Sequence, residues 1–305
     1  MVKEIEVKGI ELKKDLTVSE LLSGMDSFGL QATNLSKALK IFKKMREDKA
    51  TIFLAFTSNM VSSGLREIFA QLCREKLVDV IITTVGSVEE DFIKSEKPFL
   101  LGSFDLNDKE LNEKQINRIG NILVPSDRYE WFEKKIQPFF KELYSEKKIW
   151  APVDICKKLG EKVSDKKSFL YWCAKNNIPV FCQAMMDGAF GLQAYFFKQD
   201  HKDFVIDDTA EEKLAQIVLS ADKTGAVILG GGVAKHHTIG VNLLRSGLDY
   251  AIYINSTDPF DGSLSGARTN EAISWNKINK DANHVSVQGD ASILFPVLLT
   301  AYLEK

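Results

Sequence analysis

Short apolar runs alternate with helical periods along this chain. The runs TIFLAF at 51–56 and VDVIITT at 78–84 are typical of buried strands, and between them residues 64–76 carry apolar side chains at i, i+3, i+4 and i+7. The same order returns late in the chain, with AVIL at 226–229, a helical period near 236–245 and YAIYIN at 250–255. Each group predicts a β-α-β unit.

Between these two groups, the residues Pro179–Cys182 begin a further apolar run. Residues 209–221 predict a helix capped by Thr209, and residues 128–146 predict another helix. Strands that are apolar on both faces and alternate with helices indicate a parallel sheet covered on both sides. We therefore expect an α/β fold with a doubly wound, mostly parallel sheet, Rossmann-like but without the G-x-G-x-x-G fingerprint.

The domain organisation predicted from the sequence is simple. Residues 1–305 are expected to form a single α/β domain, with 1–50 as an N-terminal helical flank. The Lys- and Glu-rich stretch at 107–167 has no Gly/Pro/Ser linker, so it is interpreted as an insertion or flank rather than a second domain.

Composition excludes several classes of protein. The chain has 40 Lys and Arg against 42 Asp and Glu, so no basic excess favours nucleic acid. The longest apolar run, 292–303, is too short to cross a membrane, and the N-terminus lacks the pattern of a secretory signal. The four cysteines are widely spaced and are expected to be core thiols in a reducing compartment, which favours a cytoplasmic protein.

Three polar or glycine-rich segments follow predicted strands, where ligands of open parallel sheets bind. They are TSNMVSSG at 57–64, TTVGSVEED at 83–91 and GGGVAKHH at 230–237. Hydroxyls, amides and backbone N–H groups at a helix start suit a pyrophosphate, and glycines let a flat ligand approach the backbone. For each segment taken singly, a capped or solvated first helical turn is the simpler interpretation.

Two further features bear on the chemistry. His236 and His237 are adjacent, and adjacent residues of a helix do not share a face, so no metal site is expected. A long polar loop at 255–268 leads to Lys277, two residues after Trp275. This lysine is either a surface cation or, if it is desolvated in an apolar slot, a nucleophile toward a carbonyl or imine.

Taken together, six blocks resemble the deoxyhypusine synthase family in order and spacing. They are TSNMVSSGLRE (57–67), TTVGSVEEDFIK (83–94), NNIPVFCQAMMDGAFG (176–191), GGGVAKHH (230–237), YINSTDPFDGSLSGARTNEAISWNK (253–277) and GDASILFPVLL (289–299). The resemblance implies an aminobutyl transferase that uses NAD. Spermidine or a related polyamine is oxidised to an imine and loses 1,3-diaminopropane, and an enzyme lysine then passes the butyl-imine to a lysine of translation initiation factor 5A. It also implies a homotetramer.

The resemblance assigns roles to particular positions. Lys277 would be the covalent lysine, and His236 would transfer protons or bind the amine. Residues for the substrate would be Glu89, Glu90, His236, Gly262, Ser263, Glu271 and Trp275. Residues for NAD would be Ser58, Asn59, Ser62, Thr84, Glu90, Asp187, Gly231, Ser256, Thr257, Asp261 and Asp290.

Three positions depart from the family pattern. Leu192 and Leu264 stand where the family has polyamine-binding aspartates, and Gln183 stands where it usually has proline. Loss of a charged partner in a buried site costs about 2–5 kcal/mol, so the amine-recognition end is expected to have changed. Three hypotheses stay open: deoxyhypusine synthase proper, a related enzyme that passes the aminobutyl group to a small amine such as putrescine, and a non-catalytic NAD-binding paralogue.

Overall fold

The computed structural model describes residues 4–209 and 211–304. The chain divides into two compact units. Unit 1 comprises Met1–Ala55 with Ala215–Lys305, and unit 2 comprises Phe56–Leu214. Each unit is described by itself below.

The largest sheet has six strands in the order β11-β10-β9-β1-β2-β7. The pairs β10–β11, β10–β9 and β2–β7 are parallel. Long crossovers separate the paired strands in sequence, as parallel pairing requires. A parallel sheet flanked by helices is the Rossmann-like, doubly wound α/β architecture, so the predicted fold class is confirmed.

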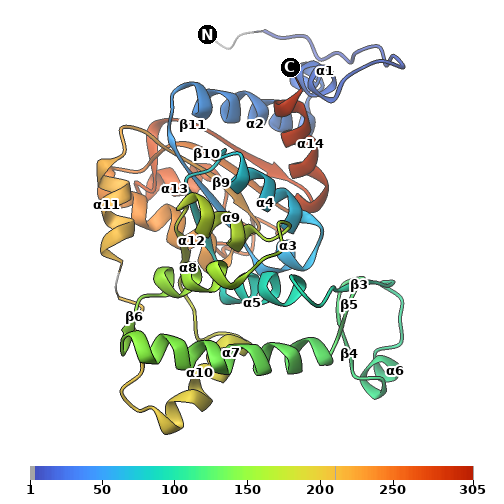
Figure 1. The fold of residues 1–305 in the computed structure, drawn as a ribbon. Coiled ribbons are helices and arrows are strands. Elements are labelled where there is room, and N and C mark those ends of the chain that lie inside the picture. The colour runs from blue at the N-terminus through green and yellow to red at the C-terminus, as the bar shows by residue number, and fades with distance from the viewer. Residues whose placement is uncertain (1–3, 210, 305) are drawn as a thin grey trace. The chain divides into compact units, whose positions relative to one another are not determined.

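Unit 1 holds four neighbouring strands of this sheet, β11, β10, β9 and β1, and the central strands β9 and β10 are almost wholly buried. Its elements are α1 (Val18–Gly24), η1 (Met25–Ser27), α2 (Leu30–Glu47), β1 (Thr51–Phe56), β9 (Thr224–Leu229), α12 (Gly232–Val241), η2 (Asn242–Arg245), β10 (Leu248–Asn255), α13 (Thr269–Ser274), β11 (Ile278–Gln288) and α14 (Ala291–Leu303). Helices α2 and α14 lie side by side (Figure 1), and the rings of Phe42 and Tyr302 meet edge to face at 4.8 Å between centroids.

Unit 2 is richer in helices. Its elements are α3 (Ser58–Ser62), α4 (Leu65–Arg74), β2 (Val80–Thr83), α5 (Val85–Lys94), β3 (Leu100–Leu101), α6 (Asp108–Glu113), β4 (Ile116–Ile119), β5 (Ile122–Pro125), α7 (Asp127–Glu146), β6 (Ile149–Trp150), α8 (Pro152–Lys162), α9 (Phe169–Asn176), β7 (Val180–Cys182), α10 (Ala189–Asp200) and β8 (Val205–Ile206). Helix α11 (Glu212–Ser220) spans the boundary between the units. The long helix α7 packs against α10 (Figure 1), where Phe140 contacts both Phe190 and Phe197.

A buried ion pair ties three helices of unit 2 together. Arg66 of α4 is 1% exposed, and its Nε donates to Oδ1 of Asp91 on α5 at 2.5 Å. The other carboxylate oxygen of Asp91 accepts from the hydroxyl of Ser168 at 2.5 Å and the backbone N–H of Leu170 at 3.1 Å, at the start of α9. Burial raises the pKa of Asp91, while the Arg66 charge opposes that shift.

The elements predicted around the two β-α-β groups are present: β1, α4 and β2 early in the chain, and β9, α12 and β10 late. The pattern missed β11 and the small antiparallel sheet β3-β5-β4, whose strands are only two to four residues long. The capping prediction at Thr209 is wrong, because α11 begins at Glu212 and the Thr209 hydroxyl donates instead to Asp207 at 2.6 Å.

All four cysteines are buried free thiols, as expected, and the Sγ atoms of Cys73 and Cys173 lie 3.5 Å apart. Among the described residues, none of the helices combines the length and apolarity that a membrane crossing requires. Within the same part of the chain, His, Cys, Asp and Glu side chains form no group of three or more that could hold a metal ion.

The ion pair predicts a strong effect of Asp91→Asn. The variant leaves the buried Arg66 guanidinium without its main counter-charge, which typically costs about 3–5 kcal/mol of the free energy of unfolding. Urea denaturation followed by circular dichroism measures this loss.

Glu75→Gln is the control, because Glu75 pairs with Arg74 on the exposed end of α4. Exposed pairs contribute at most about 1 kcal/mol, so this variant should unfold close to the wild type. Equal losses in the two variants would contradict the role given to Asp91.

Candidate functional site

The residues predicted to form the site are divided between the two units. Unit 1 carries Gly231, His236, Ser256, Thr257, Asp261, Gly262, Ser263, Glu271, Trp275, Lys277 and Asp290. Unit 2 carries Ser58, Asn59, Ser62, Thr84, Glu89, Glu90 and Asp187. The two sets are therefore considered in turn.

A cavity of about 340 Å³ in unit 1 gathers the residues predicted for covalent chemistry. Its lining residues are Lys235, His236, Ile239, Tyr253, Gly262, Leu264, Ala267, Arg268, Glu271, Ala272, Trp275 and Lys277. Lys277 is half-buried, and its Nζ lies 5.5 Å from the centroid of the Trp275 ring. The lysine, tryptophan, histidine and glutamate predicted from the sequence thus share one cavity.

The turn after α13 sets the position of Lys277. Asn276 has a left-handed backbone, with φ of 54°, which asparagine tolerates better than most residues. The N–H of Lys277 donates to the carbonyl of Ala272 at 2.9 Å, and the N–H of Asn276 donates to Ile273 at 2.9 Å. These two bonds form a Schellman motif, which ends the helix and leads directly into β11. Lys277 is therefore held between a helix end and a sheet strand.

The glycine-rich turn before α12 packs tightly against the loop that follows β10. Gly230 and Gly232 have positive φ values of 83° and 62°, which glycine adopts without strain. A Cβ on Gly231 would come within 2.6 Å of the backbone of Ser265, and the Ser265 hydroxyl accepts from the N–H of Gly232 at 3.0 Å. At Gly232 a Cβ would meet nothing within 4 Å, so space remains beside the backbone for a ligand.

Lys235 is a functional candidate that the sequence analysis did not assign. It is fully buried, and its Nζ donates to the carbonyls of Ala267 at 2.6 Å and Ser265 at 3.2 Å. Burial lowers the pKa of Lys235 to about 8, against the opposing effect of Glu271. The Lys235 Nζ also lies 4.5 Å from the ring centroid of Tyr253.

Tyr253 is also new to the site. Its hydroxyl is buried at the cavity and has no hydrogen-bond partner among the residues that the structure describes. The only sequence signal for either residue is position: Lys235 directly follows the glycine-rich turn, in the first turn of α12, and Tyr253 lies near the end of a buried strand. A buried lysine is uncommon enough that burial, once known, singles it out.

The remaining unit 1 residues predicted to bind the cofactor use polar atoms to shape their own loops. Asp261 accepts from the N–H of Ser263 at 2.7 Å, and the Thr257 N–H donates to Asn255 at 3.1 Å. Asp290 is the N-cap of α14 and accepts from Ser292 N–H at 2.8 Å. Each aspartate keeps one carboxylate oxygen outside these bonds.

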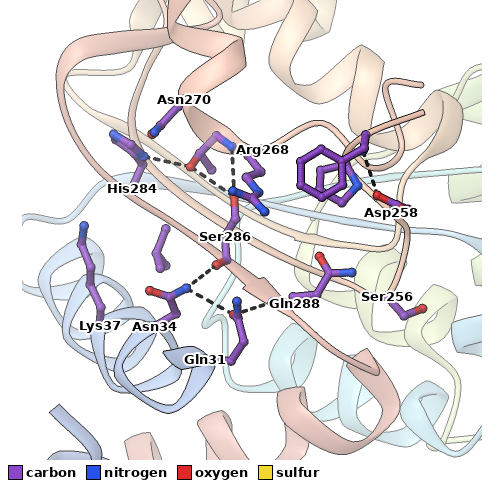
Figure 2. Close-up of a pocket in the computed structure, with 14 residues that line it drawn as sticks. Gln31, Asn34, Lys37, Ser256, Asp258, Arg268, Asn270, His284, Ser286 and Gln288 are labelled. Carbon is purple, nitrogen blue, oxygen red and sulfur yellow. Dashed lines mark hydrogen bonds between the residues drawn. The ribbon is translucent and has the colours of Figure 1, made fainter. Parts of the chain in front are cut away.

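Ser256 lies at a second cavity of unit 1, of about 600 Å³ (Figure 2). This cavity is mainly polar, and its wall includes Lys37, Arg268 and His284. Many of its polar groups bond to one another, such as Gln31 with the backbone N–H of Gln288 at 2.8 Å. Arg268 lines both this cavity and the one that contains Lys277.

In unit 2, the predicted residues gather around the first half of α5. Thr84 is the N-cap residue of α5, and Gly86 lets Ser58 of α3 approach, because a Cβ on Gly86 would be 2.8 Å from the Cβ of Ser58. The hydroxyl of Ser62 donates to the carboxylate of Glu90. Asn59 lies on the same short helix and accepts from the hydroxyl of Thr57 at 2.5 Å.

The segment before α10 packs on the same helix. Glu89 accepts from the backbone N–H of Phe190 at 2.8 Å, and a Cβ on Gly188 would meet the Glu89 carboxylate at 3.0 Å. Asp187 precedes this glycine directly. Ser58, Ser62, Thr84, Glu89, Glu90 and Asp187 are thus brought to one region of unit 2.

Burial controls the charge of Glu90. Its side chain is buried beside Glu89, and burial raises its pKa to about 7, although the Ser62 hydroxyl and Lys94 favour the charged form. Lys94 is held nearby by three backbone carbonyls, those of Val61, Ser62 and Ser63, at 2.7–3.0 Å. A carboxyl poised near neutral pH can hold or release a proton at the site.

The departures from the family pattern also have definite places. Leu264 lines the cavity of Lys277. Leu192 lies on α10 and is 54% exposed. The Gln183 side chain lies near the Glu211 carboxylate and favours its charged form, which opposes the rise in pKa that burial causes.

The fold and this cavity define a doubly wound α/β protein with a lysine-bearing site. The family model for deoxyhypusine synthase matches residues 20–302, and the chain therefore belongs to the deoxyhypusine synthase family. The resemblance found in the sequence is confirmed, and membership implies an enzyme.

Individual relatives agree along nearly the whole chain. The chain is 45% identical to "Probable deoxyhypusine synthase" of Methanocaldococcus jannaschii over 315 aligned residues, covering 97% of this chain and 96% of that protein. It is 42% identical to the protein of the same name from Drosophila melanogaster, covering 96% and 88% of the two chains. A solved structure titled "Crystal Structure of a putative deoxyhypusine synthase from Entamoeba histolytica" is similar with a TM-score of 0.70 and 27% identity, covering 97% of this chain and 96% of that one.

The raised pKa of Glu90 predicts a pH-dependent stability difference between the wild type and Glu90→Gln. The unfolded carboxyl loses its proton near pH 4.5, whereas the folded one keeps it up to about pH 7. Unfolding therefore releases a proton in this window, and the free energy of unfolding of the wild type should fall by about 3 kcal/mol relative to the variant as the pH rises through it. Urea denaturation at pH 4.5, 6 and 8 measures the difference.

Glu96→Gln is the control because that side chain is exposed. The difference between this variant and the wild type should stay flat across the same range. A flat difference for Glu90→Gln as well would show that Glu90 is charged in the folded chain.

Proposed function

We propose that this chain is an aminobutyl transferase that uses NAD to move the four-carbon amine of spermidine, through an imine on Lys277, to a lysine of translation initiation factor 5A. The observation that carries the proposal is the unit 1 cavity, in which Lys277, Trp275, Glu271 and His236 come together. The names of the relatives, which match this chain over nearly its full length, support the same reaction.

The residues predicted to hold NAD are chemically suited to it. Ser58, Ser62 and Thr84 offer hydroxyls, and the open side of Gly232 leaves room for a flat group against the backbone. Carboxylates such as Asp290 and Asp261 can accept ribose hydroxyls. NAD, when bound, would supply hydride acceptance and hydride return.

The cavity residues can perform the transfer itself. Loss of a hydride and a proton from the donor leaves an imine, and the amine of Lys277 adds to its carbon while 1,3-diaminopropane leaves. The acceptor amine then displaces Lys277 in the same way, and reduction of the new imine yields a secondary amine. His236 lines the cavity and can move the protons that each exchange requires.

Glu271 and Trp275 would position the donor. Glu271 is the carboxylate of the cavity wall and can pair with one ammonium group. The Trp275 ring can cover the aliphatic carbons and attract a cation, a contact that contributes about 0.5–2 kcal/mol. At 65% exposed, Trp275 leaves much of its own ring uncovered.

We also propose that the active form is a homotetramer. Helix α10 of unit 2 exposes Leu192, Tyr195 and Phe196, with Met186 just before it, each about half exposed. Adjoining exposed apolar side chains of this size favour a covered face.

A second candidate function is transfer to a small amine such as putrescine. The specific observation in its favour is Leu264, which faces the cavity where the family pattern has an aspartate. A changed amine site is compatible with a changed acceptor, while the Lys277 chemistry stays the same.

Lys277→Ala should abolish transfer, because the variant lacks the amine on which the imine is proposed to form. The assay incubates the full chain with NAD, labelled spermidine, and either purified translation initiation factor 5A or putrescine. Label on a protein lysine supports the main proposal, and label on a small amine supports the second candidate. Borohydride added before the acceptor should trap label on the wild-type chain and not on the variant.

Lys280→Ala is the matched control, since Lys280 is an exposed lysine on the neighbouring strand β11. It should keep full transfer. NAD binding, measured by calorimetry, should persist in Lys277→Ala. Transfer by Lys277→Ala at the wild-type rate would remove Lys277 from the mechanism, and a wild type that binds NAD without any transfer would indicate a non-catalytic protein.

A further inference from the structure

The wall of the Lys277 cavity contains an aliphatic side chain, Leu264, in a loop that is otherwise polar. Residues 261–266 read D-G-S-L-S-G, and Leu264 is half-buried against the cavity. An ammonium group beside this leucine would lose water and gain no charged partner there, which disfavours its charged form. An alkyl group in the same place has no charge whose hydration would be lost, and its burial would remove apolar surface from water.

The loop is held so that Leu264 stays in the wall. The carbonyls of Ser265 and Ala267 on one side of the loop both accept from the buried Lys235, and the Ser265 hydroxyl accepts from Gly232. A Cβ on Gly266 would come within 1.9 Å of the carbonyl oxygen of Asp258, so the loop closes tightly on itself. Leu264 is therefore fixed from several directions.

The charged side chains around the cavity also favour a ligand with a single ammonium group at this end. Glu271 is the single carboxylate among its lining residues, against the amines and guanidinium of Lys235, Lys277 and Arg268. The nearby loop acids Asp258 and Asp261 are not in the wall, and each accepts a backbone N–H of its own loop, from Phe260 and Ser263 respectively. One carboxylate can neutralise one ammonium.

The acids of unit 2 that were predicted to bind amines are already engaged within that unit. Glu89 accepts the backbone N–H of Phe190 at 2.8 Å, and Glu90 accepts the hydroxyl of Ser62. Burial raises the pKa of both carboxyls, which favours their neutral forms. Both carboxyls therefore already accept hydrogen bonds within their own unit, and burial opposes the charged form that would pair with an ammonium group.

We propose that this cavity selects an amine with an uncharged alkyl end, an N-alkylated diamine, over a polyamine that is charged at both ends. In this arrangement Glu271 pairs with an ammonium group and Leu264 contacts the alkyl end. The proposal rests on the proposed transfer through Lys277, and it replaces spermidine as the preferred donor of that reaction with an N-alkylated diamine. Leu264 is the residue that sets the preference.

The test compares spermidine with its two desamino analogues, N-propylputrescine and N-butyl-1,3-diaminopropane, in each of which a hydrogen atom replaces one terminal ammonium group, so that one arm ends in a methyl group. Calorimetry with the NAD-saturated full chain, without an acceptor, measures the Kd of each. For the wild type, one analogue should bind at least about tenfold more tightly than spermidine, and Leu264→Asp should reverse the order, because a new carboxylate restores a partner for the second ammonium.

Leu264→Asn is the matched control, since it has nearly the shape of aspartate without the charge. It should weaken the analogue and fail to improve spermidine. Wild-type binding of spermidine at least as tight as that of both analogues would overturn the proposal. An equal shift in preference in Leu264→Asp and Leu264→Asn would also overturn the proposal, because the charge of the new side chain would then not be the cause of the shift.

Borohydride trapping separates this proposal from the proposed function. If the tighter ligand leaves a trapped adduct on Lys277, both stand. If the analogue binds more tightly and no adduct forms, the substrate preference stands and the transfer reaction fails. If an adduct forms with spermidine while the analogues bind more weakly, the transfer reaction stands and the preference fails.

Discussion

The contact between Arg66 and Asp91 is the constraint on which unit 2 depends. A carboxylate that is fully buried can stay charged only where its surroundings replace the lost water, and here a guanidinium, a hydroxyl and a backbone N–H do so. Because these donors come from α4 and from the start of α9, the partners of one side chain fix three helices. Glu89 and Glu90 precede Asp91 directly on α5. Because the ion pair fixes the position of α5, it also fixes where these two predicted acids lie.

Unit 1 uses a buried cation for a similar purpose. Lys235 is held by the backbone carbonyls of Ser265 and Ala267, so its ammonium ties the loop of residues 261–267 to α12. The Schellman turn at Asn276 fixes the opposite side of the cavity. The hydrogen bonds of the buried Lys235 and the Schellman turn at Asn276 therefore place Leu264 and Lys277 on one cavity wall.

Much of the fold follows from hydrophobic pattern because strands buried on both faces and amphipathic helices leave strong signals. The short strands β3, β4 and β5 leave almost none, and β11 is polar at many positions along its length, so its membership of the sheet comes from pairing with β10 rather than from its own residues. Helix α11 begins later than its composition indicates, because the Thr209 hydroxyl donates to Asp207 in a turn before the helix and does not cap it.

The sequence also predicted some residues of the candidate site and missed others. Residue types and block order were enough to name Lys277, Trp275, Glu271 and His236, which the structure brings to one cavity. Lys235 and Tyr253 were missed because burial, not identity, makes them notable, and burial at a particular position is a tertiary property. The assignments to NAD remain predictions, because they depend on a ligand rather than on the chain.

The buried cysteines carry one more consequence. All four thiols are inaccessible, and burial raises the pKa values of Cys156, Cys173 and Cys182, so thiolate is scarce in the folded chain. Alkylating reagents attack thiolate, and they can reach these sulfur atoms only after the surrounding helices and strands separate. The rate of iodoacetamide labelling therefore reports the rate of local unfolding around each cysteine. The cysteine that reacts first identifies the part of the fold that opens first.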